Sequence, residues 1–116
     1  MVRGMDDDLI AGHVQELRRG TVVLACLTTL ARPHYGYALL ETLADAGFAV
    51  DGNTLYPLLR RLEKQGLLTA EWNTDDTRPR KFYLVTPDGA AVLDRLRTEW
   101  RSLDTAIGAL DGGTQR

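Results

Sequence analysis

Apolar residues recur at intervals of three and four along the first part of the chain, the spacing that brings side chains onto one face of an α-helix. This spacing predicts a helix over residues 8–31. Gly20 weakens it, because a glycine inside a helix costs about 1 kcal/mol relative to alanine, so the segment is either two helical pieces or one helix with close packing at the glycine. Pro33 ends the segment, since the residue before a proline is driven out of the helical conformation. A second helix is expected over residues 35–46, ended by Gly47.

A stripe of leucines predicts a third helix over residues 53–65. The stripe consists of Leu55, Leu58, Leu59 and Leu62. Asn53 is the expected N-cap and Gly66 follows the helix, as is typical of helix ends. Pro57 comes just after the first turn, where we expect it to cost little.

Two short runs rich in β-branched and aromatic residues, 67–72 and 81–85, predict a β-hairpin over residues 67–85. The polar segment 73–80 between them forms its tip. Trp72 is expected to pack within this hairpin rather than to bind a ligand.

A last helix is expected over residues 87–110, with Thr86 as its N-cap, and the tail 111–116 is expected to be disordered. The order of elements predicts an α+β, mostly α fold. Residues 1–86 form a winged helix-turn-helix domain, whose third helix is the recognition helix and whose hairpin is the wing. The last helix follows as a C-terminal dimerisation helix.

Composition excludes several classes of protein. The chain of 116 residues has 14 Lys and Arg against 16 Asp and Glu, a net charge of −2, which argues against a uniformly basic nucleic-acid binder. With Cys26, His13 and His34 as its only soft ligands it is not expected to hold a metal, and a reduced, cytoplasmic setting is the simplest interpretation. The apolar stretch 21–31 is about half of the roughly 20 residues that a membrane span needs. No cofactor is expected, and no arrangement of nucleophile, acid and base suggests an enzyme.

The charges of the predicted recognition helix and wing differ from those of the whole chain. Residues 52–82 hold six cations and four carboxylates, a local charge of +2. The candidate DNA-binding residues are Asn53, Thr54, Tyr56, Pro57, Arg60, Arg61 and Lys64 on the helix and Arg78, Arg80 and Lys81 on the wing. The cations are expected to contact phosphates, and Asn53, Thr54 and Tyr56 to reach base edges in the major groove. The alternatives are a merely solvated helix face, or a winged-helix protein-interaction module without DNA binding.

The last helix carries apolar residues separated by 3, 4, 3, 4 and 3 positions, which is the seam of a coiled coil. They are Leu93, Leu96, Trp100, Leu103, Ile107 and Leu110. We interpret this seam as a homodimer interface with the first or last helix of a second copy; the alternative is packing on the first helix of the same chain. A two-fold dimer predicts a pseudo-palindromic operator in double-stranded DNA. Trp100 either fills the dimer core or binds a small planar hydrophobic effector.

Six segments between residue 16 and about residue 110 resemble the PadR family of transcriptional regulators. They are 16–21 (ELRRGT), 35–37 (YGY), 53–59 (NTLYPLL), 61–67 (RLEKQGL), 80–83 (RKFY) and 84–89 (LVTPDG). The resemblance implies a dimeric winged-helix repressor with a single C-terminal helix. Some members bind flat aromatic compounds at the dimer interface beside a tryptophan in a setting like Glu99–Trp100. Asn53 stands where the family often has glycine, and the hairpin tip lacks the usual glycine pair.

Overall fold

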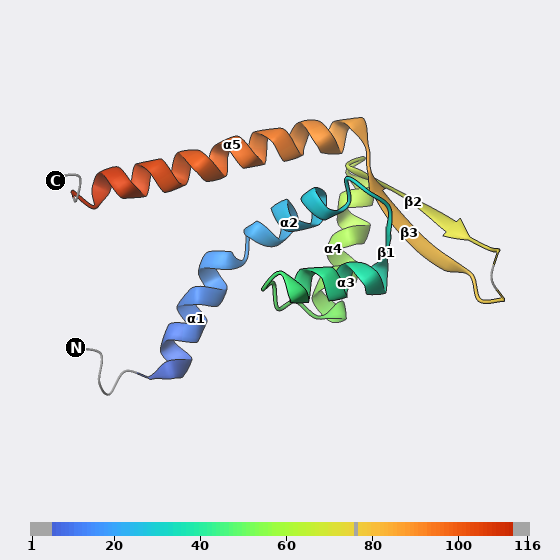
Figure 1. Ribbon diagram of the computed structural model, residues 1–116, viewed down its shortest axis with the longest axis horizontal. Coiled ribbons are helices and arrows are strands. Elements are labelled where there is room, and N and C mark those ends of the chain that lie inside the picture. The colour runs from blue at the N-terminus through green and yellow to red at the C-terminus, as the bar shows by residue number, and fades with distance from the viewer. Residues whose placement is uncertain (1–5, 76, 113–116) are drawn as a thin grey trace.

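The protein is a three-helix unit with a projecting β-hairpin and two projecting helical arms (Figure 1). The computed structural model describes residues 6–75 and 77–112. The elements in chain order are α1 (Asp7–Arg18), α2 (Thr21–Thr29), β1 (His34–Tyr35), α3 (Gly36–Asp45), α4 (Gly52–Lys64), β2 (Leu68–Asn73), β3 (Arg80–Val85) and α5 (Pro87–Leu110). The molecule measures 58 × 34 × 21 Å, because the wing and the arms extend in opposite directions.

The core lies where α2, α3 and α4 meet the base of the sheet. It consists of Cys26, Leu27, Leu30, Leu39, Leu43, Leu55, Leu59, Leu62, Leu68, Tyr83 and Leu93. Three of the four leucines in the predicted stripe of α4 are therefore buried, and Leu58 is half-buried beside them. Burial of this leucine-rich face is the main force that holds the helices together.

The sheet has a third strand that the sequence pattern did not predict. β3 pairs antiparallel with β2 over its whole length, and its other edge pairs with β1 through His34↔Tyr83 and Tyr35↔Phe82. Tyr35, expected to begin the second helix, therefore belongs to a strand, and α3 starts one residue later. A two-residue strand leaves no periodic signal in the sequence, since it is defined only by its distant partner.

Of the two alternatives for residues 8–31, the structure has the two helical pieces and not the single helix. Arg19 and Gly20 separate α1 from α2, and the Thr21 hydroxyl donates to the carbonyl of Arg18 at 2.6 Å. No atom lies within 4 Å of where a Cβ of Gly20 would stand, so close packing does not explain the glycine. The break redirects the chain, and α1 then extends away from the core with no buried residue.

The N-cap of α4 is Asp51, not Asn53 as expected. Asp51 has an extended backbone, and its Oδ1 accepts a hydrogen bond from the Thr54 amide at 2.9 Å. The helix therefore begins earlier, at Gly52, and Pro57 lies inside it. Because proline has no N–H, the carbonyl of Asn53 loses its helical partner. The C-terminal ends of α3 and α4 follow the prediction, with Gly47 at φ +96° after α3 and Gly66 at φ +80° after α4.

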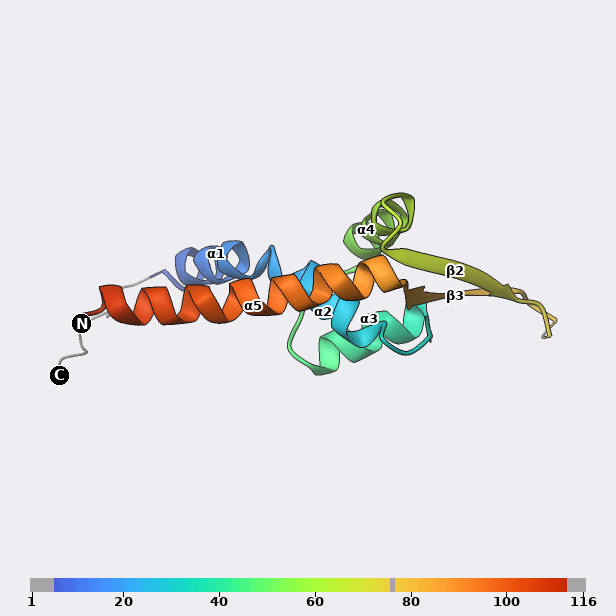
Figure 2. The ribbon, with the colours of Figure 1, turned by 90° about the horizontal axis from the view of Figure 1, so that it is seen from above.

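Helix α5 has the predicted bounds. The Thr86 hydroxyl accepts from the Gly89 amide at 3.0 Å and donates to the carbonyl of Gly66 at 2.7 Å, which fixes the start of the helix on the turn after α4. The first turns of α5 pack on α2, and its remainder runs beyond the core (Figure 2). Asp111 caps the helix instead of belonging to a disordered tail, and residues 113–116 lie outside the described residues.

Candidate nucleic-acid interface

The face of α4 opposite its leucines is open to solvent. Asn53, Thr54 and Pro57 are exposed in its first turns, and Arg60, Arg61 and Lys64 are exposed further along. Within residues 6–75 and 77–112, none of these three cations forms a side-chain hydrogen bond or ion pair. The helix thus presents one polar and cationic face whose charges are not neutralised by the protein.

Tyr56, expected to reach base edges, has its ring packed against two helix starts. A Cβ at Gly36 would lie 2.6 Å from Tyr56 Cε1, and a Cβ at Gly52 would lie 3.1 Å from Cε2. The half-buried ring therefore occupies the space that these two glycines leave open. Its packing fixes the start of α3 against α4, and larger residues at Gly36 would separate the two helices.

Arg80 of the wing is bound by two tyrosines. Its Nη1 donates to the Tyr37 hydroxyl at 2.9 Å, and its guanidinium carbon lies 4.3 Å from the centre of the Tyr35 ring. The two tyrosine rings stack with centroids 6.0 Å apart, and Asn73 Nδ2 donates to the Tyr35 hydroxyl at 2.6 Å. These contacts tie both strands of the wing to β1 and the start of α3.

Lys81 is also bound to the protein. Its ammonium lies 3.5 Å from Glu63 Oε1 of α4 and 5.4 Å from the centre of the Tyr83 ring. Arg78, at the tip of the wing, is exposed. Of the three cations predicted on the wing, two are therefore part of the contact between the wing and the helices. The sequence pattern did not predict Tyr35 and Tyr37 as partners of Arg80. The segment 35–37 stood out only through the family resemblance, which does not indicate what these tyrosines contact.

The seam predicted on α5 divides into two parts. Leu93 is buried in the core of the same chain, so its assignment to a dimer interface is wrong, and Leu96 packs half-buried against that core. The reason is that the first turns of α5 cover α2. Trp100, Leu103 and Ile107 are 52–61% exposed and Leu110 is 84% exposed. The alternative, packing of the seam on the first predicted helix (8–31) of the same chain, therefore holds for the first turns of α5, which pack on α2, and is wrong for these four exposed residues.

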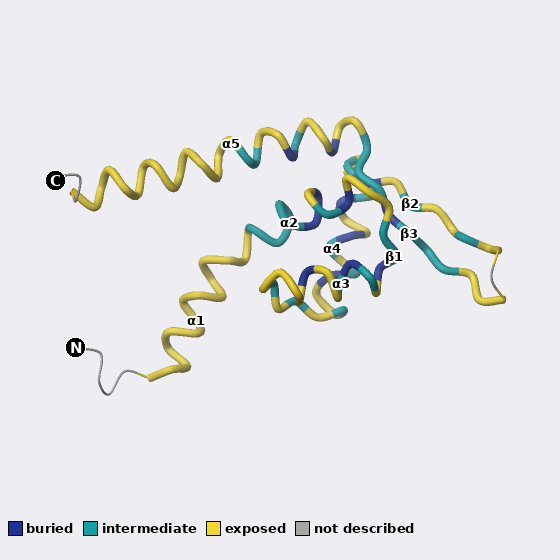
Figure 3. Tube along the Cα trace, viewed as in Figure 1, coloured by how far each residue is buried: buried dark blue, intermediate teal, exposed yellow. Residues whose placement is uncertain are grey.

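Helix α1 has an apolar face of its own. Leu9, Ile10, Val14 and Leu17 are 44–77% exposed and, with His13, line one shallow hollow. Figure 3 shows that α1 and the outer part of α5 are exposed along their lengths. We call these two segments the arms. Apolar stripes on isolated arms are typical of helices that pack against another chain.

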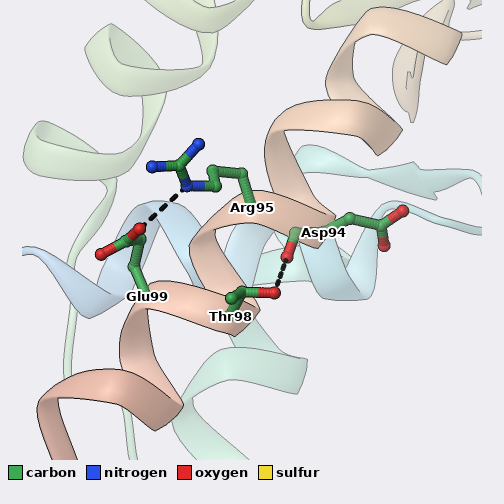
Figure 4. Close-up of polar contacts among 4 residues, drawn as sticks. All are labelled: Asp94, Arg95, Thr98 and Glu99. Atoms are coloured by element: carbon green, nitrogen blue, oxygen red, sulfur yellow. Dashed lines mark hydrogen bonds and ion pairs between the residues drawn. The ribbon is translucent and has the colours of Figure 1, made fainter.

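The polar face of α5 pairs within itself. Arg95 Nε donates to Glu99 Oε2 at 2.9 Å, and the Thr98 hydroxyl donates to the carbonyl of Asp94 at 3.1 Å (Figure 4). Glu99, which precedes Trp100 in the segment that resembles the family, is thus bound by Arg95, one helical turn nearer the start of α5.

The thiol of Cys26 lies in the core. It is fully buried, and this burial raises the pKa of the Cys26 thiol to about 12. In the described part of the chain there is no group of three His, Cys, Asp or Glu side chains that could hold a metal ion. The described helices include none that is both long and apolar enough to cross a membrane.

An exposed polar helix that follows a two-helix unit and precedes an antiparallel hairpin defines a winged helix-turn-helix protein. The family model described as "Transcriptional regulator PadR-like family" matches residues 23–95. The chain therefore belongs to the PadR-like family of transcriptional regulators. The match covers the three-helix unit, the wing and the first turns of α5, and leaves out α1 and the outer part of α5. The family comprises regulators, not enzymes.

Known relatives agree with this membership. The chain is 37% identical over 101 residues to "Transcriptional regulator Rv3488" of Mycobacterium tuberculosis, across 86% of this chain and 92% of that one. A crystal structure of a PadR family transcriptional regulator from Eggerthella lenta has 48% identity and a TM-score of 0.86, over 90% of this chain and 93% of the other. A PadR-like regulator from Bacillus cereus has 26% identity and a TM-score of 0.74, over 82% and 95% of the two chains.

Proposed function

We propose that this regulator is a homodimeric repressor that binds specific double-stranded DNA, with α4 in the major groove and the wing on the flanking backbone. The observation that carries the proposal is the exposed face of α4, where Arg60, Arg61 and Lys64 have no side-chain partner among the residues that the structure describes. A helix of 10–12 Å diameter fits a groove about 12 Å wide. Asn53 and Thr54 in the first turn are then nearest to the base edges.

The electrostatic part of binding comes from four cations in each protomer: the three on α4 and Arg78. Arg80 and Lys81 contribute mainly by holding the wing, since both have protein partners. Each phosphate neutralised lowers the slope of log affinity against log salt by about 0.9. Four contacts from each of two protomers correspond to a slope of about −7.

The dimer is supported by the two arms. Their apolar faces are exposed in the single chain, and a two-fold axis would pair the surface that these faces form with the identical surface of a second copy. Because both α1 and outer α5 carry such faces, the proposed interface includes both helices. Two recognition helices would then meet half-sites about one turn of DNA apart, which predicts a pseudo-palindromic operator.

We further propose that a small planar hydrophobic compound releases the repressor from DNA by binding at Trp100. The side chain is 52% exposed and lies on the proposed seam, where two indoles could stack on a flat ligand. Such a compound should quench Trp100 emission, and Trp100→Ala should weaken its binding. Unaltered affinity in this variant would contradict the assignment.

The test of DNA binding is the salt dependence of affinity for a duplex from the DNA upstream of the gene. Arg60→Ala with Lys64→Ala should weaken binding and reduce the slope by about 3.6 for a dimer, two contacts for each protomer. The matched control is Arg95→Ala with Arg101→Ala, which removes the same charge from exposed positions of α5. An unchanged slope in the α4 variant would refute the assigned contacts. Absence of any retardation at low salt would favour the alternative, a winged-helix module that binds protein.

The test of the dimer is a mass measurement. Trp100→Glu with Leu103→Glu should convert a particle of twice 12.9 kDa into one of 12.9 kDa, because four carboxylates would face one another across the axis. Arg101→Glu, off the seam, is the control. A variant that keeps the doubled mass would mean that the interface lies elsewhere.

A further inference from the structure

Trp72 is 62% exposed, so the expectation that it packs within the wing is wrong. It is the last but one residue of β2, in the hairpin that projects from the helices (Figure 1). A large indole held in water on a rigid strand contributes little to folding, and exposed tryptophans are typical of contact sites with a partner.

The register of the hairpin fixes the side on which the indole lies. Trp72 is directly opposite Lys81, so the two side chains share one face of the sheet. The Lys81 ammonium contacts Glu63 of α4, which means that this face is turned towards the recognition helix. Glu71 is on the opposite face, paired across from Phe82.

We propose that Trp72 is a DNA-contact residue whose indole lies against the sugar-phosphate backbone between the groove entered by α4 and the tip of the wing. The inference rests on the proposed DNA-binding function. The flat apolar ring suits a deoxyribose, and the indole N–H can donate to a phosphate oxygen. On the face of Trp72 the carboxylate of Glu63 is already paired with Lys81, and exposed Arg78 further along the hairpin can contact a phosphate. The exposed carboxylates among the described residues of the hairpin lie elsewhere, Glu71 on the opposite face and Asp75 beyond the end of β2.

Intrinsic fluorescence tests the proposal, since Trp72 and Trp100 are the only tryptophans of the chain. A fluorescein-labelled duplex from the DNA upstream of the gene reports binding through its anisotropy, independently of tryptophan. The expected result is that saturating duplex quenches the emission of the unmodified protein and protects it from acrylamide, and that both effects disappear in Trp72→Phe. If the duplex binds and Trp72→Phe shows the same change as the unmodified protein, the signal comes from Trp100 and the proposal is wrong.

Affinity provides the second measurement. Trp72→Ala should weaken binding about 10-fold, a usual loss for a buried aromatic contact, without changing the salt slope, because no charge is removed. Thr69→Ala, an exposed position on the opposite face of the same strand, should bind like the unmodified protein. An unchanged affinity for Trp72→Ala would overturn the proposal.

Two further outcomes identify a different occupant. If the emission of a Trp100→Phe variant, whose single tryptophan is Trp72, shifts with protein concentration in the absence of DNA, the indole is covered by a second copy and not by DNA. If the duplex does not raise the anisotropy even at low salt, the proposed DNA binding fails as a whole, which differs from binding without a change at Trp72.

Discussion

Gly89 is the position where one added methyl group should do most harm. In the first turn of α5, a Cβ would lie 2.1 Å from the carbonyl oxygen of Leu67 and 2.6 Å from Cγ2 of Val85. That carbonyl already accepts a hydrogen bond from the Thr86 amide at 3.0 Å, so it cannot turn away without breaking the junction. Gly89→Ala must therefore push α5 off the turn that follows α4.

The magnitude follows from two opposing terms. Overpacking costs about 1–3 kcal/mol, and the upper end applies because the obstacle is backbone. Replacing glycine by alanine inside a helix returns about 1 kcal/mol. We expect Gly89→Ala to lower the free energy of unfolding by about 2 kcal/mol.

Gly108 provides the control in the same helix. Nothing lies within 4 Å of its Cβ position, so Gly108→Ala should raise stability by about 1 kcal/mol. Urea unfolding followed by far-ultraviolet circular dichroism, at one protein concentration because association adds stability, should separate the two variants by about 3 kcal/mol. Equal stability of the two variants would refute the close approach of α5 to the turn.

Three further predictions concern Arg18, Cys26 and the contact between Tyr37 and Arg80. Arg18 donates to the carbonyl of Gly47, in the turn between α3 and α4, at 2.6 Å. Arg18→Ala should therefore speed amide exchange in α1 and lower the free energy of unfolding by about 1 kcal/mol. Arg19→Ala is the control, because its partner Glu16 lies within α1, and it should not alter the exchange. Burial raises the pKa of the Cys26 thiol from 9.0 to about 12, so the thiol of the unfolded chain ionises first as the pH rises. The contribution of Cys26 to the free energy of unfolding should therefore be lost between pH 9 and pH 12. At pH 8 the native thiol should resist Ellman's reagent until urea unfolds the protein. A double-mutant cycle of Tyr37→Phe and Arg80→Gln should give a coupling energy of about 1 kcal/mol in urea unfolding, and zero coupling would contradict the wing contact.

Local signals in the sequence predicted the helices that position the site. The leucines of α4 are buried because a spacing of three and four residues defines a helix face whatever the remainder of the fold. Thr86 and Pro87 fixed the start of α5 for the same reason, since a cap and a first-turn proline act within a few residues. The N-cap of α4 was misjudged because Asp51 and Asn53 are both good caps, and the loop before the helix decides between them.

Long-range contacts could not be predicted. Arg80 and Tyr37 are 43 residues apart, and no periodicity connects a wing cation to a tyrosine on another helix. The burial of the six-residue seam of α5 could not be predicted for the same reason. Its spacing defines a face correctly, but Leu93 is covered by its own chain while Ile107 is exposed, and only the fold distinguishes these two ends of one stripe.

The paired wing cations change what the net charge of −2 means. By sequence, all six cations of residues 52–82 are candidates for DNA contact, whereas in the structure Arg80 and Lys81 hold the wing, so the proposed DNA binding would leave four for phosphates. Fewer phosphate contacts reduce non-specific binding more than specific binding, because non-specific affinity is almost entirely electrostatic. The proposed regulator would then owe its discrimination to geometry. Lys81 ties the wing to Glu63 of α4 and Arg80 ties it to Tyr37 of α3, and the resulting position of the wing would decide whether the wing and α4 can both meet one stretch of DNA. Under the proposed DNA binding, Arg80 and Lys81 would thus contribute to specificity by holding the wing in place, although they are paired within the protein and not with phosphates.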